Sequence, residues 1–581
     1  MPWTLYRYIL RELLKVLVLT TAVMVVVLSF GAAIGPMSDG LLGPVSLIKF
    51  VLYTIPTVLG FALPFAGAFS ATVVFHTMTK DNEVLACRAG GMSYSRIFAP
   101  VVALGLVLMV VLLLLSNTIV PGFWKSAKRT VEGDVLGILV SQLNQNRPYM
   151  FGDGLVLYAD AAEMRDPPTG SSAGGLRAEQ LIVMTGVAVG EIDKASGKVS
   201  KDTTASTASA LLVRDAFGKS YITLKLVNPV YINVEGDKLQ RDIGQSEVAE
   251  TNQPIELPNP IEDEAVFFTF QDLMRLKQRP HDFDMVRSAQ SDLAAAVSRQ
   301  QLTHLIQQAL GDSASGRGFV RLKSGLNNEY YRLSARGVEP IEGGLVLTGD
   351  DAFPVTLERF DNEALQGDAI RKFDAHLAQV DVSTEEFERE PVVTVTLKRT
   401  DDRFVRVLSL TGEDLATEKD EQVIGPMRYT ERVLGVDPAT LSAEQLNDWS
   451  QREQMKDAEG VRQARAWLRF RIIQLKYMID AELYARLATA LATPLLLLLG
   501  TLLAVRLRDQ LPLVVFFWAF VLAIVTLVMI HTGQSMAERI TIEQVQAGRG
   551  LDRAIGVAVL WGGNVALLLV NARLYLRIAR N

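Results

Sequence analysis

The residues of this chain best suited by type and spacing to a function lie in a short polar stretch between two apolar segments. It runs from Asp81 to Ser93 and reads Asp-Asn-Glu-Val-Leu-Ala-Cys-Arg-Ala-Gly-Gly-Met-Ser. Asp81 can cap the amino terminus of a helix, and Glu83 then lies in the first turn, where negative charge meets the positive end of the helix dipole. The pair Gly90-Gly91 predicts the end of that helix. The chemistry expected here is therefore recognition of a partner, not catalysis.

The same stretch also has an apolar side. Leu85, Ala89 and Met92 recur at i, i+4 and i+7, which predicts one apolar stripe, with Glu83 and Arg88 pointing elsewhere. A short amphipathic helix of this kind suits docking into a groove on a soluble partner. An ordinary capped connector on a membrane surface fits the spacing equally well, so both interpretations remain open at this point.

Motifs for nucleotide or metal chemistry are missing from the sequence. Neither GxxxxGK[ST] nor HExxH occurs, so the chain has no standard loop for ATP phosphates and no zinc-protease helix. The single cysteine, Cys87, cannot form an intrachain disulfide or a CxxC site. The five histidines are scattered along the chain. We therefore expect no catalytic residue, no metal and no cofactor in this chain.

Six apolar segments must position these residues, three near each end of the chain. Each is long enough for a helix across a bilayer, which needs about 20 apolar residues, and a helix is the form that satisfies the backbone in lipid. The sequence therefore predicts an α-helical membrane protein with a 3+3 arrangement and a large insert between the two groups. The segments cover approximately residues 16–35, 50–75, 97–120, 484–505, 511–532 and 553–572.

The basic residues of the short loops and tails predict the orientation. They gather on the side that carries both termini, which places both termini in the cytoplasm and the large insert outside it. The net charge of −6 gives no reason to expect a nucleic-acid partner. The residues concerned are Arg7, Arg11, Lys15, Lys80, Arg88, Arg96, Arg506, Arg508, Arg573, Arg577 and Arg580.

The insert is expected to be mainly β, with added helices. Short Val-, Ile- and Leu-rich runs separated by turn residues predict strands, and a strand is expected to run into a helix near Phe267–Leu273. Near-helical spacing predicts a helix over Asp284–Leu310, and Ser442 is expected to cap a charged helix that leads to the fourth span. The predicted strands are Tyr149–Ala159, Leu181–Val189, Ser209–Val213, Tyr221–Val227, Val230–Val234, Phe319–Leu322, Tyr330–Leu333, Val355–Phe360, Val392–Leu397 and Phe404–Leu408.

Two features within the spans suggest further roles. Pro56, Gly60, Pro64 and Gly67 in the second span predict either a bent packing helix or a hinge in a moving gate. Glu482 and Arg486 stand four residues apart at the entrance of the fourth span. They can neutralise each other, a contribution of about 0.2–0.5 kcal/mol if exposed. Alternatively, Arg486 contacts a lipid phosphate. The spans have essentially no central charge, so an ion relay is not expected.

The stretch resembles the corresponding loop of the LptF/LptG (YjgP/YjgQ) permeases of the lipopolysaccharide transport exporter. Glu83, Arg88, Ala89, Gly91 and Ser93 carry this resemblance. It extends over about residues 1–275 and 475–581, although Gly563 stands where the family usually has proline and residues from about 280 to 445 have no recognisable counterpart. Further matches in chain order are Arg7, Tyr8, Arg11, Glu12, Pro56, Pro64, Asn117, Pro121, Glu482, Arg486, Pro494, Trp561 and Asn564.

The resemblance implies the permease subunit of an ABC-type lipid exporter in the inner membrane. Its partners would be a cytoplasmic ATPase dimer that hydrolyses ATP, a second LptF/LptG-type permease and a periplasmic jellyroll bridge protein, and its cargo would be lipopolysaccharide or a related glycolipid. The stretch at about 80–93 would be the coupling helix, with Glu83 approaching a basic residue of the ATPase. The implied parts are 1–123 (spans and coupling helix), 124–280 (periplasmic jellyroll), 281–445 (added α+β region) and 446–581 (connecting helix and spans).

Two other interpretations of the sequence remain. The oversized insert also suits a membrane-anchored scaffold for envelope assembly that transports nothing. It could instead carry the active site of a membrane enzyme within residues 280–445.

Overall fold

The computed structural model describes most of the chain. Its described ranges are 3–38, 44–150, 155–168, 172–173, 176–192, 199–214, 220–235, 238–243, 248–250, 255–256, 265–311, 318–324, 329–341, 343–365, 369–384, 391–400, 403–409, 417–430, 441–452, 455, 458–542, 544 and 551–580.

Six helices of the described chain are long and apolar enough to cross a membrane, which confirms the six predicted spans. The third span continues without a break into a further helix. A π-helical turn, η1 (Leu115–Ile119), carries α4 directly into α5, and Pro121 follows this turn without a backbone N–H to donate back into it. The helices are α1 (Trp3–Ser38), α2 (Pro44–Lys80), α4 (Tyr94–Leu114) with α5 (Val120–Asn144), α9 (Glu459–Arg506), α10 (Pro512–Glu538) and α12 (Leu551–Arg580).

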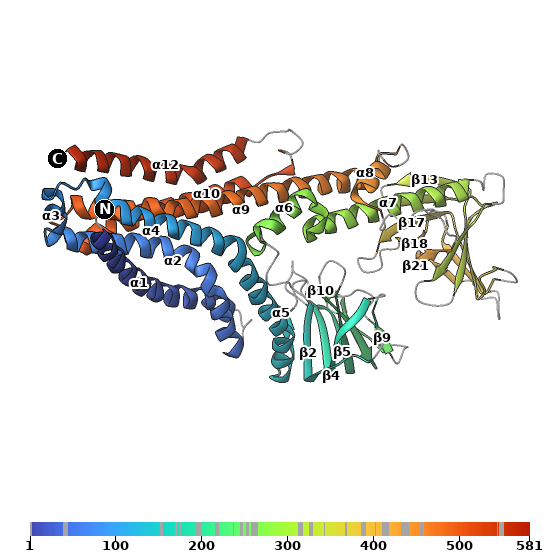
Figure 1. Cartoon of the computed structure of the whole chain (residues 1–581). Coiled ribbons are helices and arrows are strands. Elements are labelled where there is room, and N and C mark those ends of the chain that lie inside the picture. Colours follow the sequence, from blue (N-terminus) through green and yellow to red (C-terminus); the bar gives the residue numbers. More distant parts are fainter. Residues whose placement is uncertain are drawn as a thin grey trace.

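Helix α9 organises the bundle. It packs against α2, α4, α10 and α12, and Figure 1 shows it running from the bundle far toward the β-rich end of the molecule. Its 48 residues span about 72 Å at 1.5 Å per residue, more than twice a bilayer core. The amino-terminal half of α9 therefore lies outside the membrane and serves as a stalk.

The first sheet follows α5 and has ten antiparallel strands. Its central strands lie in the order β1-β2-β4-β5-β6-β10. Leu139 and Leu143 of α5 pack with Leu157 and Ile182 of the sheet in one apolar core. The strands are β1 (Tyr149–Met150), β2 (Leu155–Arg165), β3 (Ser172–Ala173), β4 (Leu176–Ile192), β5 (Val199–Arg214), β6 (Ser220–Val227), β7 (Val230–Glu235), β8 (Lys238–Ile243), β9 (Val248–Glu250) and β10 (Ile255–Glu256).

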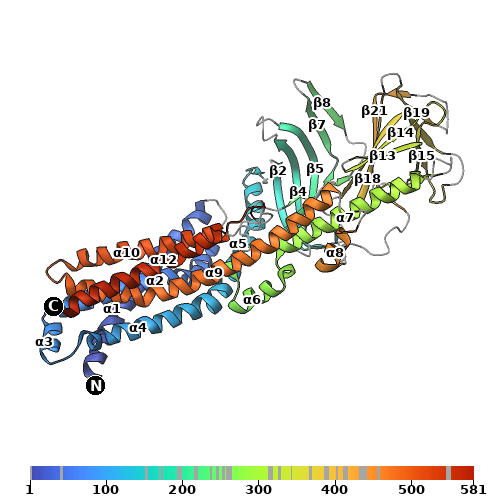
Figure 2. The same ribbon diagram turned by 90° about the horizontal axis from the view of Figure 1, so that it is seen from above.

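Helical segments then build the rest of the stalk. The helical segments that follow or flank the sheets are η2 (Ala265–Phe267), α6 (Phe270–Gln278), η3 (Pro280–Asp282), α7 (Asp284–Gly311) and α8 (Ala443–Ser450). Leu293 of α7, Leu446 of α8 and Leu468 of α9 belong to one buried cluster. Figure 2 shows α7 alongside the outer half of α9, so these two helices carry the second sheet away from the bundle.

The second sheet has eleven antiparallel strands in the order β13-β14-β17-β18-β21-β11-β12-β15-β16-β19-β20. Leu302, Ile306 and Leu310 of α7 pack onto its apolar face. The strands are β11 (Val320–Ser324), β12 (Tyr330–Ser334), β13 (Gly337–Ile341), β14 (Gly344–Thr348), β15 (Val355–Phe360), β16 (Arg371–Ala375), β17 (Leu377–Thr384), β18 (Pro391–Lys398), β19 (Val405–Ser409), β20 (Thr417–Lys419) and β21 (Glu421–Tyr429).

The predicted elements of the insert are largely confirmed, with two corrections, and residues 151–154 of the predicted strand Tyr149–Ala159 lie outside the described residues. The helix start expected near Phe267–Leu273 is confirmed, because α6 begins at Phe270, where Thr269 caps it with a capping box. The strand expected before it is wrong, because Ala265–Phe267 forms the short helix η2. Ser442 does cap α8 through Gln445. The helix it caps ends at Ser450, and α9 begins separately at Glu459.

Candidate functional site

The segment between α2 and α4 folds into a short helix, α3 (Glu83–Ala89), at the end of the bundle that also holds both termini (Figure 1). The prediction that Asp81 caps it is wrong. The cap position belongs to Asn82, whose φ of 60° is left-handed, and no side chain caps the helix. Asparagine adopts this conformation more easily than most residues, which lets the chain reverse directly after α2.

One side of α3 is anchored to the bundle. Val84 is 4% exposed and lies in the same core as Met78 of α2 and Ile97 of α4. Cys87 and Met92 pack against this core as partly buried residues. Met92 lies beyond the end of the helix, so the expected stripe that includes it is wrong. The helix ends three residues earlier, at Ala89, and Gly91, with φ of +82°, turns the chain toward α4.

The other side of α3 is free and apolar. Leu85 is 61% exposed, and Ala86 and Ala89 are exposed next to it. We name Leu85, Ala86 and Ala89 the α3 knob. It shares Leu85 and Ala89 with the predicted stripe and has Ala86 in place of Met92.

Charged residues flank the α3 knob. Glu83 accepts a hydrogen bond of 3.5 Å from the Tyr8 hydroxyl of α1, and the Arg88 guanidinium lies 4.3 Å from the centroid of the Tyr94 ring. Burial, and next the Glu83 carboxylate, raise the pKa of the Cys87 thiol. Ser93 stands at the start of α4, where its hydroxyl lies 3.0 Å from that of Ser95.

Helix α2 remains one continuous helix through Pro56 and Pro64. A Cβ on Gly67 would collide with the Leu497 side chain of α9, so Gly67 lets α2 and α9 approach closely. A Cβ on Gly60 would have no atom within 4 Å. The hinge stays a prediction, with Gly67 also having a packing role.

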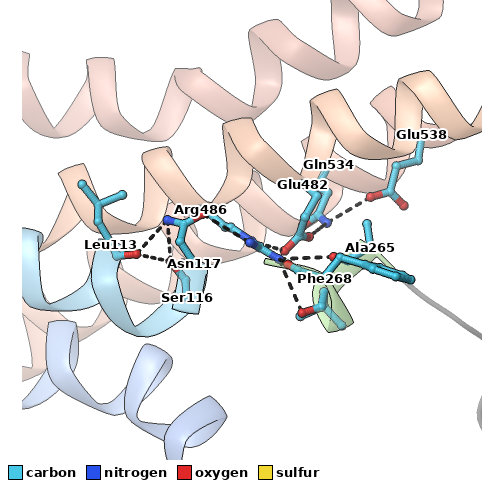
Figure 3. A network of polar contacts seen from close by, with 10 residues as sticks. Leu113, Ser116, Asn117, Ala265, Phe268, Glu482, Arg486, Gln534 and Glu538 are labelled. Carbon is cyan, nitrogen blue, oxygen red and sulfur yellow. Dashed lines mark hydrogen bonds and ion pairs between the residues drawn. The ribbon is translucent and has the colours of Figure 1, made fainter. Parts of the chain in front are cut away.

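A polar network lies where α9 meets α4, α10 and the chain returning from the first sheet (Figure 3). Arg486 donates to the Glu482 carboxylate at 2.7 Å and to the Asn117 side-chain oxygen at 3.3 Å. It also donates to the backbone carbonyl oxygens of Ala265 at 3.2 Å and Phe268 at 3.1 Å. A single guanidinium thus ties three chain segments together.

The network continues on both sides of this guanidinium. Gln534 of α10 donates to Glu482 at 2.9 Å and to Glu538 at 3.0 Å. Asn117 lies in the π-helical turn and donates to the Leu113 carbonyl at 2.7 Å. π-turns of this kind frequently mark functional sites. The sequence showed Glu482 with Arg486 but gave no sign of Gln534.

The Glu482–Arg486 pair is buried, with side-chain exposures of 10% and 6%. The energy of about 0.2–0.5 kcal/mol expected for an exposed pair at this spacing therefore does not apply to it, because burial adds both attraction and a desolvation cost. Contact of Arg486 with a lipid headgroup stays a prediction, and it would require the guanidinium to leave the acceptors that hold it here.

A second ion cluster, missed by the sequence reasoning, lies two residues from this pair. Asp480 accepts from Lys277 of α6 at 2.5 Å and from Arg553 of α12 at 2.7 Å. The Arg553 guanidinium also lies 4.1 Å from the Tyr477 ring centroid. Asp480 therefore connects the stalk to the last span.

One hydrolase-like pattern in the sequence has no matching structure. Residues 170–174 read Gly-Ser-Ser-Ala-Gly, which fits GxSxG. That motif needs its serine on a turn from a strand into a helix. Ser172 instead begins the two-residue strand β3, which pairs with β4.

A family profile described as "Lipopolysaccharide export system permease LptF/LptG" matches residues 7–298, half of the chain. This chain belongs to the LptF/LptG family. It is therefore a multi-pass inner-membrane permease of lipopolysaccharide export and not a classical enzyme. The match includes α3 and the first sheet and ends within α7, before the second sheet. Among curated proteins, no sequence relative matches the chain.

Proposed function

We propose that this chain is the membrane subunit of an ABC-type exporter that extracts lipopolysaccharide from the inner membrane, driven by a separate cytoplasmic ATPase dimer. A second LptF/LptG-type permease completes the membrane part. The α3 knob is the observation that carries this proposal. It is an apolar surface on a helix that the bundle holds on its opposite side.

The build of α3 suits transmission of force. Val84 anchors the helix to the bundle, and the Tyr8–Glu83 hydrogen bond connects it to α1, so a push on α3 reaches two spans. Burial of Leu85 in a partner groove would contribute about 1.5–3 kcal/mol. Glu83 lies beside the knob, where it could meet a basic residue of the ATPase.

The arrangement of the ends supports a cytoplasmic α3. Figures 1 and 2 place both termini and α3 at one end of the molecule and both sheets beyond the other end. The end with α3 carries most basic residues of the short loops, the pattern of cytoplasmic loops. On this orientation the sheets lie in the periplasm.

The first sheet suits a passage for acyl chains. Its buried face is apolar and rich in alanine, including Ala159, Ala162, Ala208 and Ala210. Each methylene moved out of the bilayer costs about 0.8 kcal/mol unless an apolar surface receives it. A jellyroll bridge protein that pairs with an edge strand would extend this surface across the periplasm.

The first experiment tests coupling. Leu85→Asp places a charge in the α3 knob and should abolish retention of the ATPase during purification and release of lipopolysaccharide. Leu511→Asp is the matched control, because Leu511 is 71% exposed just before α10 at the same end of the bundle. Normal retention and release with Leu85→Asp would refute the proposal.

The second experiment tests orientation. In a Cys87→Ser background, Leu85→Cys should react with a membrane-impermeant maleimide only after the inner membrane is opened. Phe353→Cys, at a 58% exposed residue in the turn before β15 of the second sheet, should react as soon as the outer membrane is opened. Labelling of Leu85→Cys in cells with an intact inner membrane would contradict a cytoplasmic α3.

A further inference from the structure

The second sheet brings like charges face to face on three neighbouring strands. Arg321 of β11 stands directly opposite Arg332 of β12. Lys323 of β11 stands directly opposite Arg428 of β21. Like charges at directly opposed positions destabilise an antiparallel pair unless something compensates them. We name these four residues the cationic face.

All four side chains project from the sheet surface opposite its core. Leu322, Leu333 and Met427 alternate with them along the strands and are buried in the apolar cluster beneath α7. Successive side chains of a strand point to opposite sides, so the cationic face is directed away from α7. The same face also carries Tyr330 and Phe360, which are buried with Leu365 and Ala369 in a second, smaller apolar cluster.

The two arginines converge on one aromatic ring. Their guanidinium carbons lie 5.5 Å (Arg321) and 5.1 Å (Arg332) from the Phe319 ring centroid. Arg332 also meets Glu358 at 3.6 Å and donates to the Leu365 carbonyl at 3.0 Å. The Arg321 guanidinium makes a cation–π contact with the Phe319 ring.

Both arginines are partly covered by the protein, and the Arg332 side chain is 34% exposed. Within the described chain, the Nε atoms of Arg321 and Arg332 are buried without a hydrogen-bond partner. Leaving a buried charged donor unsatisfied is unfavourable. A compact anion at the exposed ends of the two guanidiniums would accept from their terminal nitrogens and screen their mutual repulsion. The planar guanidinium presents paired donors that match a phosphate group.

We propose that the cationic face binds phosphate groups of the lipopolysaccharide headgroup as the cargo leaves the membrane. The inference rests on lipopolysaccharide being the cargo and needs no assumption about the ATPase. A compact dianion fits two guanidiniums on one ring better than the spread carboxylates of an acidic protein surface do. The second sheet then guides the polar headgroup, while the first sheet receives the acyl chains.

The test measures binding of lipopolysaccharide to the full-length protein in detergent, with enzymatically dephosphorylated lipopolysaccharide as the comparison ligand. The double variant Arg321→Gln/Arg332→Gln should bind the phosphorylated ligand at least tenfold more weakly. Its affinity for the dephosphorylated ligand should stay within twofold of that of the wild type. Unchanged hydrogen exchange in β11 and β12 verifies that the variant sheet is folded.

The chain offers a matched control on the same sheet. Arg336 lies over Phe353 and pairs with Asp350, and Arg399 lies over Phe404 and pairs with Asp420. Arg336→Gln/Arg399→Gln removes two exposed guanidiniums that lie over different aromatic rings and are each paired with a carboxylate. It should change the affinity for lipopolysaccharide less than twofold.

Several outcomes would overturn the proposal. One is equal binding of phosphorylated and dephosphorylated ligand by the wild type, and another is wild-type affinity in Arg321→Gln/Arg332→Gln. Inorganic phosphate binding as tightly as lipopolysaccharide would instead indicate a phosphate-ion site. A photocrosslinker at Lys323 that captures an acidic protein in cells, and no lipopolysaccharide, would refute the proposal and show that the cationic face binds that protein. ATPase retention should be normal in the double variant, so failure here is separable from failure of the coupling proposal.

Discussion

Loss of the buried Arg486 guanidinium should weaken the junction between α9, α4 and the stalk far more than loss of a surface arginine. In Arg486→Met, Glu482 keeps Gln534 as a donor but loses its ion-pair partner, and the carbonyls of Ala265 and Phe268 lose their shared donor. Breaking a buried ion pair in this way costs about 3–5 kcal/mol.

The same helix supplies the reference pair. Glu459 and Arg462 form an ion pair three residues apart in α9, with side-chain exposures of 39% and 60%. Exposed helical pairs contribute about 0.3–0.5 kcal/mol. Arg462→Met should therefore cost about a tenth of what Arg486→Met costs, although the two changes have the same chemistry.

Reversible unfolding in mixed micelles of mild detergent and dodecyl sulfate measures both free energies. A double-mutant cycle with Glu482→Gln isolates the pairwise part, which should be about 1–3 kcal/mol. A cost below about 0.5 kcal/mol for Arg486→Met, equal to that of the surface pair, would refute the conclusion that the network is a buried junction.

Three further predictions follow from local geometry. Ser442→Ala removes the capping box of α8 and should cost about 1 kcal/mol, seen as faster hydrogen exchange in α8; unchanged exchange would contradict it. Asp480→Asn should loosen α6 from α9 and accelerate exchange in α6, whereas the exposed Asp448→Asn should not. Burial raises the pKa of Asp374, opposed by Lys372, so the folded sheet binds this proton more tightly than the unfolded chain does. The free energy of unfolding should therefore rise as the pH falls from above the folded-state pKa of Asp374 toward 3.8, the ordinary pKa of aspartate. Asp374→Asn should remove that rise, and an unchanged pH profile of denaturant unfolding would refute it.

Several features followed from the sequence because short-range physics determines them. A continuous apolar run in lipid has to be a helix, so the six spans were predictable from length and composition alone. Helix α7 followed from the spacing of its apolar residues, and the start of α8 followed from Ser442 and Gln445, which satisfy each other's backbone locally.

Local sequence patterns did not predict the structure correctly where it depends on residues that are far apart in the chain. Strands such as β13, with an exposed pattern, and β20 were not predicted, because pairing with other strands makes them extended. Asp81 has the right residue type for a cap, yet the tight reversal after α2 puts Asn82 at that position. Which side of α3 faces the core was likewise decided by contacts with α2 and α4.

The sequence by itself therefore determined a six-span permease with a large β-rich insert and a segment suited to partner recognition. Only the tertiary structure decided that Arg486 is buried among acceptors from three chain segments and that Arg321 stands opposite Arg332. The physical reason is that burial and register arise from residues far apart in the chain. The surroundings of a charged side chain, and thus its energetic role, are set after the backbone has brought those residues together.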